Sequence, residues 1–338
     1  MKVIYSPNHS RHAPRDQFIG GGLRPNPDVP ARAEAILDAI RGTYDVLPPR
    51  AFSMDAIRAV HDAGYLRFLE RVHAAWVDRG GGSETGLIPD TFASRASVRM
   101  PRDPVHQAGY YSFETQTPIL EHTFAAAREA AYCALTGAAM LLEGEPSVYA
   151  LCRPPGHHAA GDLYGGYCYL NHAAAAARYL SAAGRVAVLD VDYHHGNGTQ
   201  SIFYGSDAVL FVSIHADPDF EYPYFSGYAD ESGKGAGLGL NVNLPLAIGT
   251  GETRYLETLD RALIEVDRFA PAFLVVSLGV DICREDPLGK FGLQVSTFET
   301  IGRRIARADL PTLLVQEGGY DLDGIGACVQ NVLDAFGR

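Results

Sequence analysis

The sequence has few cysteines and no long apolar run, and both absences narrow the class of protein. Its 338 residues include five cysteines, and no two of them stand in C-x-x-C spacing. An odd number of unclustered thiols is typical of a reducing compartment, and we expect Cys133 and Cys152 to pack in the core. No apolar stretch approaches the roughly 20 residues of a membrane-spanning helix, and the N-terminus lacks a signal-peptide core. We therefore expect a cytoplasmic protein that does not act at a membrane.

Basic residues are also scarce. Lys and Arg number 28 against 40 Asp and Glu, which gives a formal net charge of −12. Nucleic-acid binding needs clustered positive charge, so this balance argues against DNA or RNA as the main partner. An acidic surface attracts cationic ligands weakly. With 47% hydrophobic and 20% charged residues, the chain can bury a large core.

The order of apolar segments predicts one α/β domain spanning residues 1–338. Beyond residue 121, continuous apolar segments alternate with segments of helical periodicity. Uninterrupted apolar strands are typical of a parallel sheet covered by helices on both faces, and the alternation indicates right-handed βαβ units. The expected strands are 2–5, 147–152, 185–192, 208–215, 272–281 and 311–320. The expected helices are 53–61, 64–78, 121–142, 172–183, 252–268 and 297–308, with others after Pro30, near residue 200 and at the C-terminus.

A long segment, about 80–120, separates the first helices from this regular part. It opens with three consecutive glycines and contains four prolines. A loop of this length in a compact domain is usually a lid, a binding loop or an interface. A disordered insert is the alternative, and aromatic residues such as Phe92 and Tyr110 argue against it.

Reactive side chains follow four of the expected strands. The residues at these strand ends are Arg153 to His158, Asp190 to His195, Asp281 and Tyr320. In a parallel sheet the carboxyl ends of the strands share one edge, where ligands bind, so residues far apart in the sequence can meet there. This convergence predicts an active site at the carboxyl edge of the sheet.

Asp192, His194 and Asp281 are the metal ligands that this convergence predicts. Side chains alternate along a strand, so Asp192 and His194 share one side, and Asp281 arrives from a neighbouring strand. Two carboxylates and one imidazole leave a position for water, as in catalytic zinc sites. Fe²⁺, Co²⁺ and Mn²⁺ suit the same donors. Taken singly, each aspartate could instead cap a helix or accept hydrogen bonds from loop amides.

Five motifs, taken in order, resemble the zinc-dependent deacetylase superfamily. They are RPPGHHA (153–159), GGYCYLNHAAAAA (165–177), LDVDYHHGNGTQ (189–200), SLGVD (277–281) and EGGY (317–320). That superfamily contains histone deacetylases, acetoin-utilisation proteins and acetylpolyamine amidohydrolases, and the resemblance implies an arginase-like three-layer α/β fold. The segments VHDAGYLRFLE (60–70), QAGYY (107–111) and SGYADESGKGAG (226–237) are most similar to the acetylpolyamine amidohydrolase branch. The resemblance covers nearly the whole chain.

The resemblance implies that the three predicted ligands bind zinc and that catalysis uses five further residues. His158 would be the general base that takes the proton of the attacking water. His157, paired with Asp190, would stay closer to cationic. Asn197 would orient His158 without adding a charge. Tyr320 would donate a hydrogen bond to the oxyanion.

The resemblance also implies a narrow substrate tunnel and two structural potassium ions. Tyr167 and Tyr222 match the aromatic walls of the tunnel. The expected substrate contacts are Tyr167, Tyr222, Gly166, Gln17, His106 and Gln116. One potassium site would use Asp190, Ser213 and the carbonyls of Asp192, His194 and Ile214, and the other would use Phe203, Ser206, Val209 and Asn243.

The chain departs from this pattern at the tunnel mouth. Polyamine-specific members have acidic residues there, whereas this sequence places Val105, Gln116 and Gln17 at three such positions. The acidic residues nearby that could substitute are Asp103, Glu114, Glu121 and Glu84. Loss of carboxylates removes an electrostatic reason to prefer an ammonium substrate. An acylated lysine or a neutral amide therefore stays open as a substrate.

The function expected from the resemblance is deacetylation of N-acetylated polyamines or related small acyl amides. The long loop of this branch typically supports a homodimer whose narrowed entrance excludes folded protein, which favours small substrates. The alternatives are a lysine deacylase acting on protein tails and a binding protein without turnover. The complete set of ligands, the histidine pair and the tyrosine argue against the binding protein. A binuclear manganese ureohydrolase would need further Asp and His ligands that these motifs do not supply.

Overall fold

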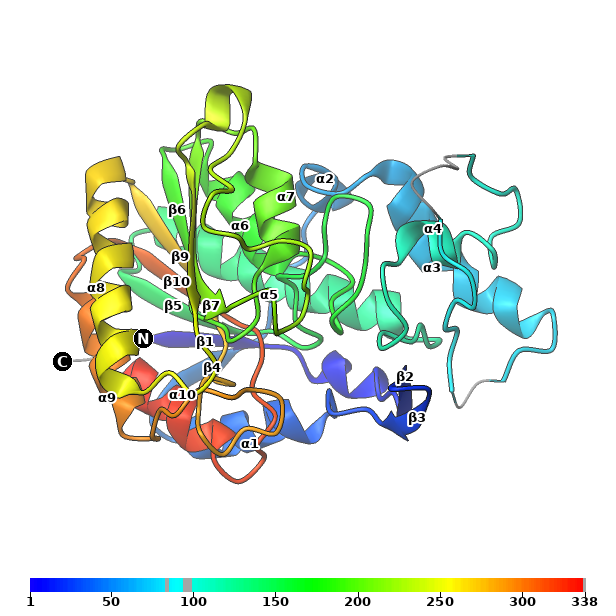
Figure 1. Ribbon diagram of the computed structural model, residues 1–338, viewed down its shortest axis with the longest axis horizontal. Coiled ribbons are helices and arrows are strands. Elements are labelled where there is room, and N and C mark those ends of the chain that lie inside the picture. Colours follow the sequence, from blue (N-terminus) through cyan, green and yellow to red (C-terminus); the bar gives the residue numbers. More distant parts are fainter. Residues whose placement is uncertain (83–84, 94–98, 337–338) are drawn as a thin grey trace.

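An eight-stranded parallel sheet forms the centre of the molecule. The structure is a computed structural model that describes residues 1–82, 85–93 and 99–336. The strand order is β4-β1-β5-β10-β9-β6-β7-β8, and every neighbouring pair is parallel (Figure 1). The strands are β1 Lys2–Tyr5, β4 Asp45–Leu47, β5 Ser147–Leu151, β6 Val186–Asp190, β7 Val209–Ala216, β8 Asn241–Leu246, β9 Phe273–Leu278 and β10 Thr312–Gln316.

Helices cover both faces of this sheet, which confirms the predicted α/β class (Figure 1). One face carries α5 Thr123–Leu142, α6 His172–Leu180 and α7 Asn197–Phe203, with α2 Met54–Arg58, α3 Ala63–Val77 and α4 Ala108–Tyr111 beyond them. The other face carries α1 Ala31–Ile40, α8 Glu252–Phe269, α9 Thr297–Ala306 and α10 Ile325–Asp334.

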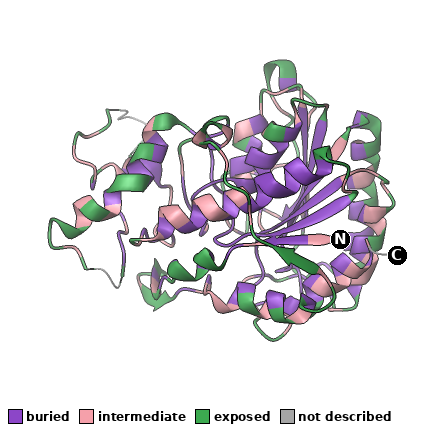
Figure 2. Ribbon diagram, turned by 180° about the vertical axis from the view of Figure 1, so that it is seen from behind, coloured by how far each residue is buried: buried purple, intermediate pink, exposed green. Residues whose placement is uncertain are grey.

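The alternation of side chains along the central strands builds two separate cores. Val186 and Val188 of β6 belong to the core that contains α5 and α6, whereas Ala187 and Leu189 belong to the core that contains α8. All four are fully buried, and Figure 2 shows the strands enclosed between the helical layers. Because neither face meets water, these strands are continuously apolar in sequence.

The edges of the sheet were harder to predict than its centre. β4 is three residues long and all three are exposed, and in β8 the residues Asn241, Asn243 and Pro245 interrupt the apolar pattern, so neither strand was predicted. The antiparallel hairpin of β2 Asp16–Ile19 and β3 Gly22–Pro25 is likewise largely exposed. Edge strands bury one side or less, so their composition resembles that of loops.

The described part of segment 80–120 packs against the body of the protein. Val105, Ala108, Tyr111 and Ile119 are buried in the core next to α3 and α5. The main chain of Leu87 forms an isolated antiparallel bridge with Ile119. These described residues of the segment therefore contribute to the core. Glu84, one of the acidic residues considered for the tunnel mouth, lies outside the described residues.

The cysteines and the helices can be compared with what the composition predicts. The five cysteines are buried and free, and Cys133 and Cys152 lie in the core as predicted. Within the described ranges, no helix combines the length and apolarity that a bilayer crossing requires.

Candidate active site

Strand β6 delivers its acidic residues to the carboxyl edge of the sheet and ends at Asp190. The backbone then makes two turns supported by aspartate. The amide of Asp192 donates to Oδ1 of Asp190 at 3.1 Å, and the amide of His194 donates to Oδ1 of Asp192 at 2.9 Å. A carboxylate that accepts an amide two residues ahead replaces the lost strand partner. Asp192 and His194 therefore lie in a loop rather than on the strand predicted for them.

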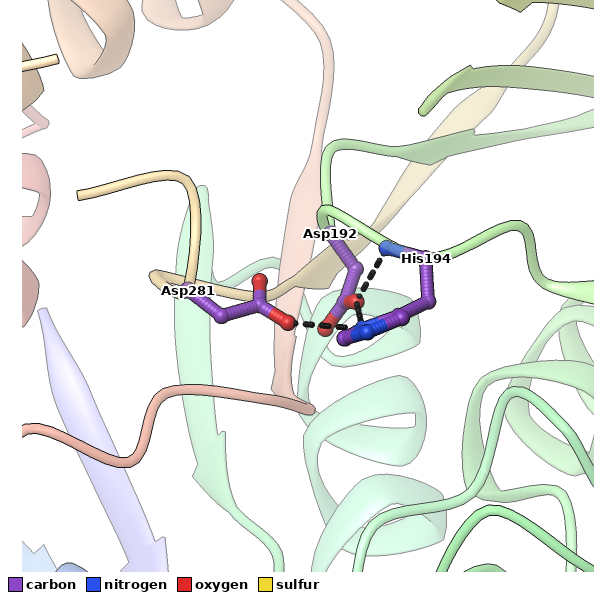
Figure 3. Close-up of side chains that lie close together, drawn as sticks. All are labelled: Asp192, His194 and Asp281. Carbon is purple, nitrogen blue, oxygen red and sulfur yellow. Dashed lines mark hydrogen bonds and ion pairs between the residues drawn. The ribbon is translucent and has the colours of Figure 1, made fainter. Parts of the chain in front are cut away.

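The three predicted metal ligands nevertheless point toward one another (Figure 3). Nδ1 of His194 lies 3.0 Å from Oδ2 of Asp281 and 3.3 Å from Oδ1 of Asp192. One donor atom from each residue falls within 4.8 Å of the other two. The structure thus brings together residues from the ends of β6 and β9, which are neighbours in the sheet.

The backbone holds one oxygen of each ligand carboxylate. The amide of Gly318 donates to Oδ2 of Asp192 at 2.8 Å, and the amide of Tyr193 donates to Oδ1 of Asp281 at 2.9 Å. The remaining oxygens face His194. The aspartates therefore accept loop amides, as in the alternative interpretation, and this anchoring also directs one oxygen of each toward His194, which is the arrangement that the metal-ligand interpretation requires.

These donors fit a divalent cation. Asp192 and Asp281 are 1% and 0% exposed. Burial, together with the charge of Asp192, raises the pKa of Asp281 to about 7. Two buried carboxylates that face each other are unfavourable without a positive charge between them. A set of two carboxylate oxygens and one imidazole nitrogen suits zinc, iron(II), cobalt(II) or manganese(II).

His157 and His158 are adjacent but meet different partners. Nδ1 of His157 lies 3.0 Å from Oδ2 of Asp190, and Nδ1 of His158 lies 2.7 Å from Oδ1 of Asn197. Burial would lower the pKa of His157, but Asp192 and Asp190 outweigh it and raise that pKa to about 10. Burial lowers the pKa of His158 well below its usual value, and the charge of His157 lowers it further. One imidazole is therefore cationic and the other neutral, with the lone pair of His158 on Nε2.

Tyr320 lines the same pocket as His158 and His194. It follows Gly319, whose φ of 122° is accessible to glycine and strained for other residues. The guanidinium of Arg32 lies 4.3 Å from the centre of the Tyr320 ring. Burial raises the pKa of Tyr320 well above 10, so the phenol stays protonated and can donate a hydrogen bond.

A pocket of about 150 Å³ leads to these groups. It is lined by Ile19, Gln116, His158, Gly166, Tyr167, His194, Tyr222, Tyr224, Leu288 and Tyr320. The predicted contacts Tyr167, Tyr222, Gly166 and Gln116 are therefore part of its wall. At Gly166 a Cβ atom would lie 2.2 Å from Cδ2 of His158, so only glycine fits beside this imidazole.

Two other predicted contacts lie away from the pocket wall. Gln17 is buried, and its Oε1 accepts a hydrogen bond from the hydroxyl of Tyr167 at 3.0 Å. His106 lies in a separate hollow of segment 80–120, beside Asp103, at 3.7 Å from its carboxylate. Within one chain, Gln17 stabilises Tyr167 of the pocket wall, and His106 does not reach the pocket.

The residues expected at the first potassium site lie together. Asp190 pairs with Ser213 in the register of β6 and β7, and Ile214 follows Ser213. Asp192 and His194 belong to the loop that leaves β6, so their carbonyls lie close in the chain. This placement is compatible with the expected site.

The second expected potassium site needs a correction. The amide of Ser206 donates to the carbonyl of Phe203 at 2.8 Å, close to the start of β7 at Val209. Asn243 instead pairs with Ser213, which lies four residues along β7 from Val209. At about 3.3 Å per residue, Ser213 is about 13 Å from Val209 along the strand. The register therefore does not bring Asn243 to the other three residues, because β8 begins opposite Phe211 and runs away from the end of β7 at which Val209 lies.

Asp286 is a site residue that the sequence did not reveal. Its carboxylate is 6% exposed. Oδ2 accepts the amides of Tyr320 and Asp321 at 2.5 and 3.2 Å, and Oδ1 accepts those of Leu288 and Gly289 at 2.9 and 3.3 Å. One carboxylate thus fixes two loops that line the pocket. A single acidic residue in a loop carries no spacing signal by which it could have been found.

Glu317 supports the histidine pair in a similar way. Its Oε2 accepts the amides of Gly156 and His157 at 2.6 and 3.0 Å. Glu317 is part of the EGGY motif, but no separate role was predicted for it. Its contacts join the end of β10 to the loop that follows β5, and these strands are neighbours.

The parallel three-layer fold and this set of buried ligands define a metal-dependent amide hydrolase of the deacetylase class. Residues 26–336 match the histone deacetylase domain, and the chain belongs to the histone deacetylase family. It is 45% identical to acetylpolyamine amidohydrolase 1 of Pseudomonas aeruginosa and 42% identical to acetylpolyamine amidohydrolase of Mycoplana ramosa, over 98–99% of each chain. The crystal structure of acetylpolyamine aminohydrolase from Burkholderia pseudomallei superposes with a TM-score of 0.95 at 43% identity, covering 100% of this chain and 99% of that one. The predicted family is confirmed.

Proposed function

We propose that the protein hydrolyses N-acetylated polyamines or related small acyl amides to acetate and the free amine. The observation that carries the proposal is the convergence of three metal ligands, a neutral imidazole and a protonated phenol on one narrow pocket. Relatives of matching length that are called acetylpolyamine amidohydrolases support the choice of substrate. The pocket volume of about 150 Å³ suits a slender acyl chain.

Each residue of the site has one task in this proposal. Asp192, His194 and Asp281 would hold the metal ion, proposed to be zinc, which would supply a Lewis acid for the amide carbonyl and lower the pKa of the attacking water. His158 takes the proton of that water at Nε2 and returns it to the leaving amine. His157 stays cationic beside Asp190 and stabilises negative charge. Tyr320 donates a hydrogen bond to the carbonyl oxygen as charge develops on it.

Two structural features complete the proposal. We place one potassium ion at Asp190 and Ser213 with the carbonyls of Asp192, His194 and Ile214, and a second at Phe203, Ser206 and Val209. Segment 80–120 serves as a lid that joins two copies of the chain. A hollow of about 830 Å³ in this segment, lined in part by Trp76 and Phe92, offers apolar surface for such contact.

A substrate panel tests the proposed function. Metal-loaded protein is assayed with N-acetylputrescine, N-acetylcadaverine, N⁸-acetylspermidine and an acetyl-lysine peptide, with amine release as the measurement. We expect higher kcat/KM for the three small amides. A wide preference for the peptide would support a protein lysine deacylase instead. Binding without turnover of all four compounds would support a binding protein.

Substitution of Asp286 by asparagine should lower kcat by about 10²-fold, because misplacement of a catalytic group by about 1 Å costs that much. The amide group keeps one acceptor oxygen but turns its NH₂ toward amides that also donate, which displaces Tyr320. Steady-state kinetics and metal content measure the effect. The exposed Asp323→Asn is the matched control and should leave kcat unchanged. A folded Asp286→Asn protein with full kcat would show that Tyr320 does not depend on this carboxylate.

A further inference from the structure

Two of the five free thiols contact each other. The thiol of Cys328 donates a hydrogen bond to the sulfur of Cys283, although the two residues are far apart in the sequence. They are 1% and 2% exposed and belong to the core that contains α9 and α10. The thiols of Cys152 and Cys168, by contrast, each donate to a backbone carbonyl oxygen at 3.2 Å. Two sulfur atoms in contact need only a short further approach to form a disulfide.

The two cysteines lie in the two segments that position Tyr320. Cys283 is part of the loop that follows β9, and its carbonyl oxygen accepts the amide of Asp286 at 3.1 Å. The carboxylate of Asp286 in turn accepts the amide of Tyr320. Cys328 lies in α10, the helix that follows the Tyr320 loop. A change in the distance between the two thiols therefore acts on both supports of the phenol.

The space between these supports is already filled. At Gly319, the residue before Tyr320, a Cβ atom would lie 2.5 Å from Cγ2 of Val280 and 3.2 Å from Cδ1 of Ile325. Val280 belongs to the loop that follows β9, and Ile325 is the first residue of α10. If these two segments approach each other, the turn between them has to move, and Tyr320 moves with it.

The thiol pair lies one side chain below the surface. The thiol of Cys283 donates to Oε2 of Glu285 at 3.3 Å, and the side chain of Glu285 is 44% exposed. A small oxidant that passes Glu285 therefore meets Cys283 first and Cys328 behind it. This is the arrangement of an attacked thiol with a second, resolving thiol next to it.

We propose that Cys283 and Cys328 form a reversible redox switch, in which hydrogen peroxide joins them in a disulfide that displaces Tyr320 and lowers turnover. Peroxide oxidises Cys283 to a sulfenic acid and leaves as one water, and Cys328 then attacks that sulfur and releases the second. Overall, two S–H bonds and the O–O bond break, one S–S bond and two O–H bonds form, and two electrons pass from the sulfurs to the peroxide. A thiol reductant reverses the reaction by exchange.

The test compares the Zn²⁺-loaded protein before and after exposure to hydrogen peroxide. Zinc has no redox chemistry, so the metal itself is not oxidised. Peptide mass spectrometry should find Cys283 linked to Cys328. The kcat for N-acetylputrescine should fall by about 10–10²-fold, because displacement of a catalytic group by about 1 Å has an effect of this size. Dithiothreitol should remove the link and restore the rate. Absence of the link, or a linked protein with full kcat, would overturn the inference.

Variants of the two cysteines show whether the pair causes the loss. Cys328→Ala and Cys283→Ala each lack one partner, and after peroxide both should keep the kcat that they have without it. Two variants keep the test decisive if one of them does not fold. Losses as large as that of the parent in these variants would overturn the inference.

Cys168→Ser is the matched control, because the thiol of Cys168 is bonded to Gly166 of the pocket wall and is the other thiol whose oxidation could disturb the site. This variant should lose activity with peroxide as the parent does, and a resistant variant would contradict the role of the pair. The effect on turnover rests on the proposed function, whereas the mapped link does not. If the untreated parent hydrolyses none of the small amides, the proposed function fails, and the mapped link still decides whether peroxide joins the two thiols.

Discussion

Replacement of Tyr320 by phenylalanine should lower kcat for deacetylation by about 10²–10³, as expected for loss of one oxyanion donor. Burial raises the pKa of Tyr320 well above 10, so its hydroxyl is protonated and can donate at neutral pH. Phenylalanine keeps the aromatic face that lies 4.3 Å from Arg32. Since the lost hydrogen bond strengthens only as the carbonyl oxygen gains charge, kcat and kcat/KM should fall together. Metal content should not change.

Tyr222→Phe is the matched control for this prediction. Tyr222 lines the same pocket, and its ring centre lies 5.0 Å from that of His158. Among the described residues, its buried hydroxyl has no hydrogen-bond partner, so its removal takes away no bond. We expect a small change in kcat. Similar large losses in both variants would mean that the aromatic wall, and not the Tyr320 hydroxyl, limits the reaction.

The centre of the fold could be predicted from the sequence because it is buried on both faces. In β6, every residue from Val186 to Leu189 packs in one of two cores, and the apolar pattern is therefore unbroken. The exact strand ends could not be predicted, because the apolar pattern continues to Val191 whereas β6 ends at Asp190, where the first aspartate-supported turn begins. The edge strand β8 pairs over six residues with β7, but its polar positions conceal it.

The convergence of Asp192, His194 and Asp281 could be predicted for a related reason. Their position depends on the strand ends of a parallel sheet, and that topology follows from the pattern of buried strands. Asp286 and Glu317 could not be predicted in this way, because they act by accepting backbone amides from loops whose path the sequence does not reveal. The same limit explains Asn243, which was assigned without knowledge of the register between β7 and β8.

Substitution of Asp281 by asparagine should abolish tight metal binding while leaving the metal-free protein folded. Loss of a residue that merely supports a ligand typically costs about 10–100-fold in metal affinity, so loss of a ligand carboxylate should cost more. The asparagine oxygen can still accept the amide of Tyr193, which preserves the loop. In the metal-free protein, the change removes a buried charge and its repulsion with Asp192, which together outweigh the contact with His194 and raise the pKa of Asp281. The melting temperature without metal should therefore stay the same or rise.

Asp281→Asn should lower the stability of the metal-bound protein but not that of the metal-free protein. Thermal denaturation with and without Zn²⁺ is therefore the most informative measurement. In the parent, ligand binding should raise stability by about 2.7 kcal/mol when free metal is 100 times Kd. Asp281→Asn should lose this increase at the same metal concentration, together with activity. Asp38→Asn, with an exposed carboxylate on α1, should keep both and serves as the control. The variant separates the cost of two facing carboxylates from the benefit of the cation between them. If Zn²⁺ raised the melting temperature of Asp281→Asn as much as that of the parent, the ion would bind elsewhere, and the proposed mechanism would lose its basis.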